Sequence, residues 1–172
     1  MESSTVETQS QGARGRPELG KRDEFGGRRR AWRAVIETYG TIMPLLDEEL
    51  RDGSDLDLQT YDVLLHVREA GDPGIRMTDL ARNAVRSKSG LTTLVDRLED
   101  RGLLRRVPDA TDRRAIRITL TTTGLESFRR AAEVHVAGIE TYFVDHISET
   151  EAEVVADVLE RILRGVGSAV PQ

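Results

Sequence analysis

The sequence predicts a mainly α-helical fold that contains one short β-hairpin, and three observations support this prediction. Apolar residues recur at helical spacing over most of the 172-residue chain. Two short helical patterns stand close together between Arg76 and Gly102. A turn-rich segment between two apolar runs follows at once and ends before Gly124. Helix, turn, helix and hairpin in this order predict a winged helix-turn-helix with flanking helices at both ends.

The first two helices are predicted from apolar residues at three- and four-residue steps. The first is expected over residues 31–51, and Pro44 should kink or split it because proline cannot donate the interior hydrogen bond. The second is expected over residues 58–70. Asp57 should cap its start, and the turn-rich residues 71–74 should end it.

Two shorter helices should follow, the first capped by Thr78 and the second by Ser87. Four apolar residues of the second helix recur at helical spacing and must face the core: Leu91, Leu94, Val95 and Leu98. Other side chains of this helix point elsewhere and could bind a partner: Lys88, Ser89, Thr92, Thr93 and Arg97. Gly102 should end the helix in the left-handed conformation.

The hairpin is expected to pair residues 103–107 with residues 115–120 around the turn at 108–112. In its second strand, Ile116, Ile118 and Leu120 alternate on one face. Arg113 and Arg114 stand beside the turn and make the tip of the hairpin basic.

Two amphipathic helices are expected at the end of the chain. The first covers residues 123–145, and the second starts at Ser148, where Glu151 completes a capping box. Their apolar stripes could be core or an interface with a second copy, and periodicity does not separate the two. Only 4% of the residues are aromatic. With so many long helices, this composition favours a homodimer.

Charge is unevenly distributed along the chain. The net charge is −5, yet residues 76–117 hold 11 Arg or Lys against 6 Asp or Glu, a balance of +5. Contact with phosphates requires a local positive potential and not a basic protein as a whole. The helix-turn-helix and hairpin segment is therefore predicted to bind DNA.

Domain organisation follows from composition. Residues 1–27 are rich in Ser, Gly, Gln and charge, and are expected to be a disordered tail. Residues 28–172 should form one domain, divided into a first helix and linker (28–57), a winged-helix lobe (58–120) and C-terminal helices (121–172). The run Arg28-Arg29-Arg30 could be a basic arm that reaches DNA or simply a solvated charge run.

The segment from Arg76 to Gly124 resembles the multiple antibiotic resistance regulator (MarR) family. The wing of that family usually has the pattern D-x-x-D-R-R, an alternating strand and L-T-x-x-G. Here these positions are Asp109, Asp112, Arg113 and Arg114, followed by the run Leu120 to Gly124. The run SKSGLTTLVDRLEDRGLL resembles the recognition helix of the family and the start of its wing. The resemblance implies a transcriptional regulator, most commonly a repressor, in which the first and last helices interlock two subunits.

A two-fold dimer of this kind would place two recognition helices in successive major grooves of a pseudo-palindromic operator. Ser87 and Ser89 are expected at phosphates, and Lys88 and Thr92 at base edges, with Thr93 as a further candidate. Arg113 should enter the minor groove. Arg114 could contact DNA or pair with Asp109 or Asp112. Arg97 could contact DNA or pair with Asp96, Glu99 or Asp100 on its own helix.

The resemblance also implies a small ligand, often aromatic or anionic, between the dimer helices and the DNA-binding lobe. Polar or aromatic residues that could border such a crevice are Trp32, Tyr61, Asp62, His66 and Arg97. One branch of the family uses Trp, Asp and Arg for urate-like anions. Each residue also has an ordinary structural interpretation, with Trp32 as core or interface and Asp62 as a solvated helix residue.

The sequence excludes several other classes. It has no cysteine, which excludes disulfides and a thiol switch, and no catalytic motif, so neither enzyme activity nor a cofactor is expected. No apolar run is long enough for a membrane span, and a cytoplasmic protein is expected. Two alternatives remain: a metal-responsive regulator that uses His135 and His146, and a winged helix that binds only proteins. The basic wing tip argues against the second.

Overall fold

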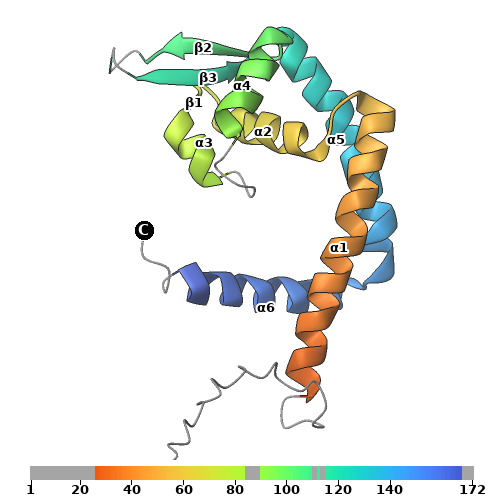
Figure 1. Ribbon diagram of the computed structural model, residues 1–172. Helices are drawn as coiled ribbons and strands as arrows, with labels where there is room; N and C mark the ends of the chain where they lie inside the picture. The colour runs from red at the N-terminus through yellow and green to blue at the C-terminus, as the bar shows by residue number, and fades with distance from the viewer. Residues whose placement is uncertain (1–25, 84–89, 110–111, 113–114, 168–172) are drawn as a thin grey trace, which may run out of the picture. The chain divides into compact units, whose positions relative to one another are not determined.

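The computed structural model describes residues 26–83, 90–109, 112 and 115–167 of the chain (Figure 1). The chain divides into two compact units, residues 1–37 and residues 38–172. Helix α1 (Gly26–Ser54) belongs to both units. The predicted tail lies outside the described residues except for its last two, Gly26 and Gly27, which are already helical.

In the first unit, the described residues form the beginning of α1. Its apolar side chains are exposed: Trp32 by 67%, Ile36 by 50% and Val35 by 41%. Helix α1 starts five residues before the predicted start at Ala31 and continues to Ser54. Of the two predicted effects of Pro44, a kink or a split, the split does not occur, because α1 is continuous through that residue.

The second unit contains the rest of α1 and all later elements. In chain order these are α2 (Leu58–Glu69), β1 (Ile75–Arg76), α3 (Met77–Asn83), α4 (Leu91–Asp100), β2 (Leu104–Pro108), β3 (Ile116–Leu120), α5 (Thr122–Tyr142), the short 3-10 helix η1 (Val144–His146) and α6 (Glu149–Gly167). Helices α2, α3 and α4 gather beside a small antiparallel sheet, as Figure 1 shows. The predicted mainly helical, winged helix-turn-helix fold is confirmed.

Three strands, and not the predicted two, make up the sheet, in the order β1-β3-β2. Strand β1 pairs Ile75 with Ile118. Because β1 has only two residues, it leaves no periodic pattern in the sequence. The register between β2 and β3 places Ile116 opposite Pro108 at the outer end of the hairpin, where Ile116 is 55% exposed. Ile116, Ile118 and Leu120 alternate along β3 as predicted, and Ile118 is the buried one of the three.

Helix boundaries confirm some predicted caps and correct others. Asp57 caps α2, accepting a hydrogen bond of 2.7 Å from Thr60 N. At the start of α6, Ser148 and Glu151 form the predicted capping box. Thr78 is not a cap: α3 begins at Met77, since the chain passes directly from β1 into the helix. Helix α5 ends at Tyr142, three residues before the predicted end.

The core of the second unit lies between α2, α3, α4 and the sheet. Its most deeply buried side chains are apolar residues from α1, α2, α3, α4 and β3: Leu50, Leu64, Leu80, Val95, Leu98 and Ile118. Phe128 and Ala132 of α5 pack against this cluster. This packing fixes the orientation of α4, because one whole face of that helix is held in the core.

Candidate nucleic-acid interface and adjacent pocket

Helix α4 presents a polar face to solvent. The four predicted apolar residues, Leu91, Leu94, Val95 and Leu98, are buried. Thr92, Thr93 and Arg97 are exposed. The polar face needed for contact with a nucleic acid is therefore present on these three side chains, and their individual roles stay predictions.

The start of α4 differs from the prediction. Gly90 occupies the N-cap position with a φ of 101°, outside the helical region, and α4 begins at Leu91. The predicted cap, Ser87, is therefore not the cap of this helix. Gly90, which has a non-helical backbone conformation, takes that position. Ser87, Lys88 and Ser89 lie outside the described residues, as do Arg113 and Arg114 at the wing tip.

The end of α4 leads directly into the wing. Gly102 adopts the predicted left-handed conformation with a φ of 71°. Gly102 N donates to Glu99 O at 2.8 Å, and Leu103 N donates to Leu98 O at 2.9 Å. These two bonds are the Schellman pattern that ends a helix and reverses the chain. They set the position at which β2 begins relative to α4.

Side-chain pairs hold the wing to the rest of the lobe. Arg106 of β2 binds Asp96 of α4 at 2.5 Å and also binds Glu99 of the same helix. These pairings raise the pKa of Arg106, the hydrogen bond to Asp96 contributing most. Asp96 and Glu99, two of the predicted partners of Arg97, thus pair with the wing instead.

Asp109 anchors the base of the wing turn, a role that the sequence analysis missed. Its side chain is 2% exposed, and its Oδ2 atom accepts hydrogen bonds from Arg76 of β1 and Arg117 of β3. Its Oδ1 atom accepts a bond of 3.3 Å from Asp112 N within the turn. The first Asp of the D-x-x-D-R-R pattern is therefore a structural centre that ties the turn to both neighbouring strands.

Arg97 lies in the electrostatic field of Asp57, the cap of α2. Burial alone would raise the pKa of Asp57, but the hydrogen bonds from Thr60 and the charges of Arg97 and Arg51 together lower it. The charge of Arg97 therefore acts on the start of α2. This contact is electrostatic, and Arg97 itself remains exposed.

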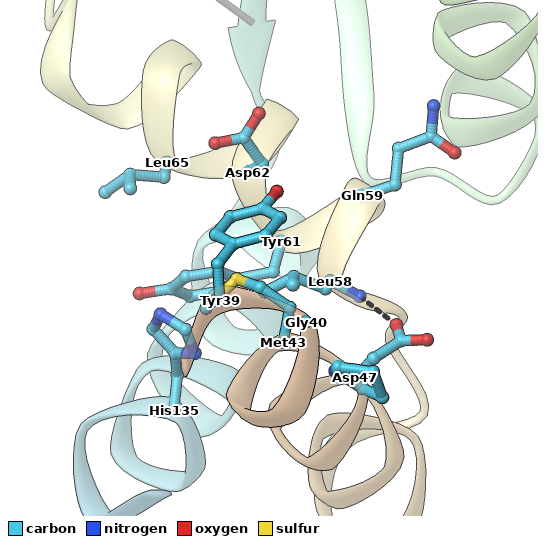
Figure 2. A pocket seen from close by; sticks show the side chains of 11 residues that line it. Tyr39, Gly40, Met43, Asp47, Leu58, Gln59, Tyr61, Asp62, Leu65 and His135 are labelled. Atoms are coloured by element: carbon cyan, nitrogen blue, oxygen red, sulfur yellow. Dashed lines mark hydrogen bonds between the residues drawn. The ribbon is translucent and has the colours of Figure 1, made fainter. Parts of the chain in front are cut away.

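A pocket of about 560 Å³ lies within the second unit, between α1, α2 and α5 (Figure 2). Its lining combines aromatic, aliphatic and acidic residues: Tyr39, Gly40, Met43, Pro44, Asp47, Leu58, Gln59, Tyr61, Asp62, Leu65 and His135. Asp47 Oδ1 accepts a hydrogen bond of 2.8 Å from Leu58 N, marked by the dashed line in Figure 2. This bond joins α1 to the start of α2 at the edge of the pocket.

Two of the five predicted ligand residues line this pocket, namely Tyr61 and Asp62. Trp32, His66 and Arg97 are not among its lining residues. His66 Nε2 lies 3.5 Å from Asp62 Oδ1 and makes no hydrogen bond to it. Tyr39, one turn before Met43 on α1, also lines the pocket and was not predicted as a ligand residue.

His135, which with His146 was the basis of the alternative metal-responsive interpretation, lines the pocket. Its ring lies 4.6 Å from the ring of Tyr61, centroid to centroid. His146 is exposed in η1. Among the residues that the structure describes, no three His, Asp or Glu side chains are placed to hold a metal ion.

Over the same residues, every helix is too short or too polar to cross a membrane.

Comparisons with known proteins agree with this architecture. The MarR family model matches residues 54–115. The HTH-type transcriptional regulator PecS of Dickeya dadantii (strain 3937) is 32% identical over 132 residues, which cover 74% of this chain and 79% of PecS. Two crystal structures from Streptomyces coelicolor are similar to this chain over 86% of its length. AbsC, a MarR family transcriptional regulator, has 28% identity and a TM-score of 0.77 over 99% of its chain.

The second structure is Sco3205, a MarR family transcriptional regulator in complex with DNA. It has 26% identity and a TM-score of 0.75, with 92% of its chain covered. Fold, wing and sequence similarity lead to one conclusion: this chain belongs to the MarR family. It is a DNA-binding transcriptional regulator of a non-enzymatic family.

Proposed function

We propose that this regulator represses transcription as a homodimer on a pseudo-palindromic operator and is released by a small molecule bound in the pocket. The observation that carries the proposal is the exposed polar face of α4, held beside the wing by Arg106. Thr92 and Thr93 would face base edges and Arg97 the backbone. Lys88, Ser87 and Ser89 would add contacts before the helix, and Arg113 and Arg114 at the wing tip.

Exposed apolar side chains support the homodimer. Along α6 they form one stripe, Val154, Val155, Val158, Leu159, Ile162 and Leu163, with exposed fractions from 36% to 71%. On α5, Val136 is 51% exposed. Contiguous exposed apolar area of this kind usually marks an interface. A second copy that buried these stripes would make the two-fold arrangement that a pseudo-palindrome requires.

The position of the pocket supports ligand-controlled release. Its wall includes Asp47 of α1 and Leu58 of α2, which are joined by a hydrogen bond. The next residue toward the N-terminus, Asp57, feels the charge of Arg97 on α4. A ligand that moved α1 against the start of α2 would therefore disturb α4 through a short chain of contacts. Such a ligand lowers the affinity for DNA if it binds the released conformation more tightly.

Footprinting on the DNA that flanks the gene of this protein tests the proposal. The expected result is protection of two symmetric half-sites about one helical turn, roughly 10 bp, apart. Arg113→Ala should weaken protection without changing the circular dichroism spectrum, since a wing tip contributes little to the core. Absence of any symmetric protected site, or full protection by Arg113→Ala at about 150 mM salt, would contradict the proposed binding mode.

A further inference from the structure

The residues that line the pocket indicate which chemical class of ligand it can bind, and they do so more specifically than membership of the family does. Three rings, those of Tyr39, Tyr61 and His135, and the apolar side chains of Met43 and Leu65 form much of the wall. Tyr61 is fixed in place, because its ring stacks on Phe128 at 5.6 Å and contacts His135 at 4.6 Å. A wall of rigid rings favours a flat aromatic ligand.

The charged groups in the lining are acidic. Asp47 and Asp62 contribute carboxylates, and none of the described lining residues is Lys or Arg. Asp47 is already neutralised, because it binds Arg51 Nη2 at 2.7 Å and accepts the bond from Leu58 N. Asp62 has no such guanidinium partner among the described residues, and its side chain is 28% exposed. Asp62 is therefore the carboxylate that is available to a ligand.

His135 does not supply the missing positive charge. Burial lowers its pKa, so its ring is neutral at neutral pH. Its Nδ1 atom is buried and has no hydrogen-bond partner among the described residues. The neutral, partly buried ring of His135 therefore adds to the aromatic wall and supplies no charge to the pocket.

Helix α1 offers a further acceptor. Residue 44 is proline and has no N–H, so the carbonyl of Gly40, four residues earlier, lacks its helical donor. Gly40 and Pro44 both line the pocket. The lining also holds the hydroxyls of Tyr39 and Tyr61 and the amide of Gln59, which can donate or accept hydrogen bonds, so the charged group that decides the preference is the Asp62 carboxylate.

We propose that the ligand is an aromatic compound that carries a positive charge or hydrogen-bond donors, and that Asp62 binds this group. The inference rests on the proposed effector role of the pocket. An aromatic carboxylate would lose its hydration beside Asp62 and find no cation in the described wall. In this proposal, the ligand of this chain is therefore not one of the anionic compounds that the family resemblance led us to expect.

Three probes of similar shape test the proposal on the intact protein: tyramine, which is cationic, 4-ethylphenol, which is neutral, and 4-hydroxyphenylacetate, which is anionic. Isothermal titration calorimetry should give the tightest binding for tyramine and the weakest for the carboxylate. Asp62→Asn should weaken tyramine binding on the order of tenfold and change 4-ethylphenol binding little. Its thermal midpoint serves as the check on folding.

Glu69→Gln is the matched control, because Glu69 lies on the same helix, is 63% exposed and is not a lining residue. It removes one negative charge and should leave tyramine binding unchanged. Tighter binding of the carboxylate, no binding of tyramine at millimolar concentration, or equal tyramine binding by wild type and a folded Asp62→Asn would each overturn the proposal. DNA binding is measured in the same samples. Tyramine binding without release of DNA would contradict the effector role and leave the ligand class supported.

Discussion

Arg106 of β2 and Asp96 of α4 form an ion pair of 2.5 Å that joins the wing to the recognition helix. Glu99, one turn further along α4, binds the same guanidinium. In the proposed complex the wing and the helix contact different grooves of one duplex, so their relative position decides whether both can bind at once. We therefore propose that the pair positions the wing and α4 for DNA binding.

Removal of this contact should weaken DNA binding more than it weakens folding. Arg106 and Asp96 side chains are 29% and 54% exposed, so their coupling energy should be about 0.5–1 kcal/mol in a double-mutant cycle with alanine. Operator affinity, measured by fluorescence anisotropy, should fall in Arg106→Ala. The exposed pair Glu160 and Arg164 of α6 is the control and should couple by a few tenths of a kcal/mol at most. Unchanged operator affinity in Arg106→Ala would contradict the proposal that this ion pair positions the wing for DNA binding.

Gly124 is required by close packing at the start of α5. A Cβ atom at this position would lie 1.9 Å from the carbonyl oxygen of Leu103, which is backbone and cannot move aside easily. Gly124→Ala should therefore lower the free energy of unfolding by about 1–3 kcal/mol in urea titrations. Gly40→Ala is the comparison, because a Cβ there meets nothing within 4 Å. It should be neutral or stabilise by up to about 1 kcal/mol. Equal stability of the two variants would mean that the contact at Gly124 relaxes freely.

A substitution at Ile162 tests whether the apolar stripe on α6 is a dimer interface. Its side chain is 53% exposed in the single chain, so Ile162→Asp should be tolerated by a monomer but not by a dimer that buries it. Sedimentation velocity should show a dimer for the wild type and dissociation or unfolding for Ile162→Asp. Asp157→Lys places a new charge on the opposite, polar face of α6 and should remain dimeric. A folded wild-type monomer at micromolar concentration would rule out the obligate dimer.

His135 should make stability depend on pH. Because burial lowers its pKa, the folded state binds fewer protons than the unfolded state once the pH falls below the ordinary histidine value of about 6.5. Stability is therefore full above that pH and is lost as the pH falls toward the lower folded pKa. The thermal midpoint should drop more for the wild type than for His135→Gln between about pH 7.5 and pH 5.5. His146→Gln, at an exposed position, should behave as the wild type does.

Much of the fold was predictable from the sequence because its signals are local. The Asp57 cap, the Ser148–Glu151 capping box and the left-handed Gly102 each depend on residues within one turn, and each is confirmed. Strand β1 could not be predicted, because its two residues are ordered by pairing with β3, 43 residues away at Ile75 and Ile118. Thr78 was misassigned for the same reason, since that pairing sets where α3 begins.

For the candidate site, the exposed face of α4 was predictable from the sequence, whereas the pocket was predictable only in part. Exposure of Thr92, Thr93 and Arg97 follows from the helical period of α4 and was predictable. The pocket was predicted in part, because its wall depends on how α1, α2 and α5 pack and not on any one motif. His135 shows this clearly: the sequence offered it only in the alternative of a metal-responsive regulator, whereas packing places its ring against Tyr61. Long-range pairs such as Arg76 and Asp109 leave no signal in a single sequence.

The central claim is that α4 and the wing of a two-fold dimer bind a specific operator. The most direct test is to select binding sites from random duplex DNA with the wild-type protein. We predict enrichment of one pseudo-palindrome with two half-sites about one helical turn apart, and loss of preference at one base pair per half-site in Lys88→Ala or Thr92→Val. Enrichment of no sequence, or of a single asymmetric site bound by one chain, would contradict the account.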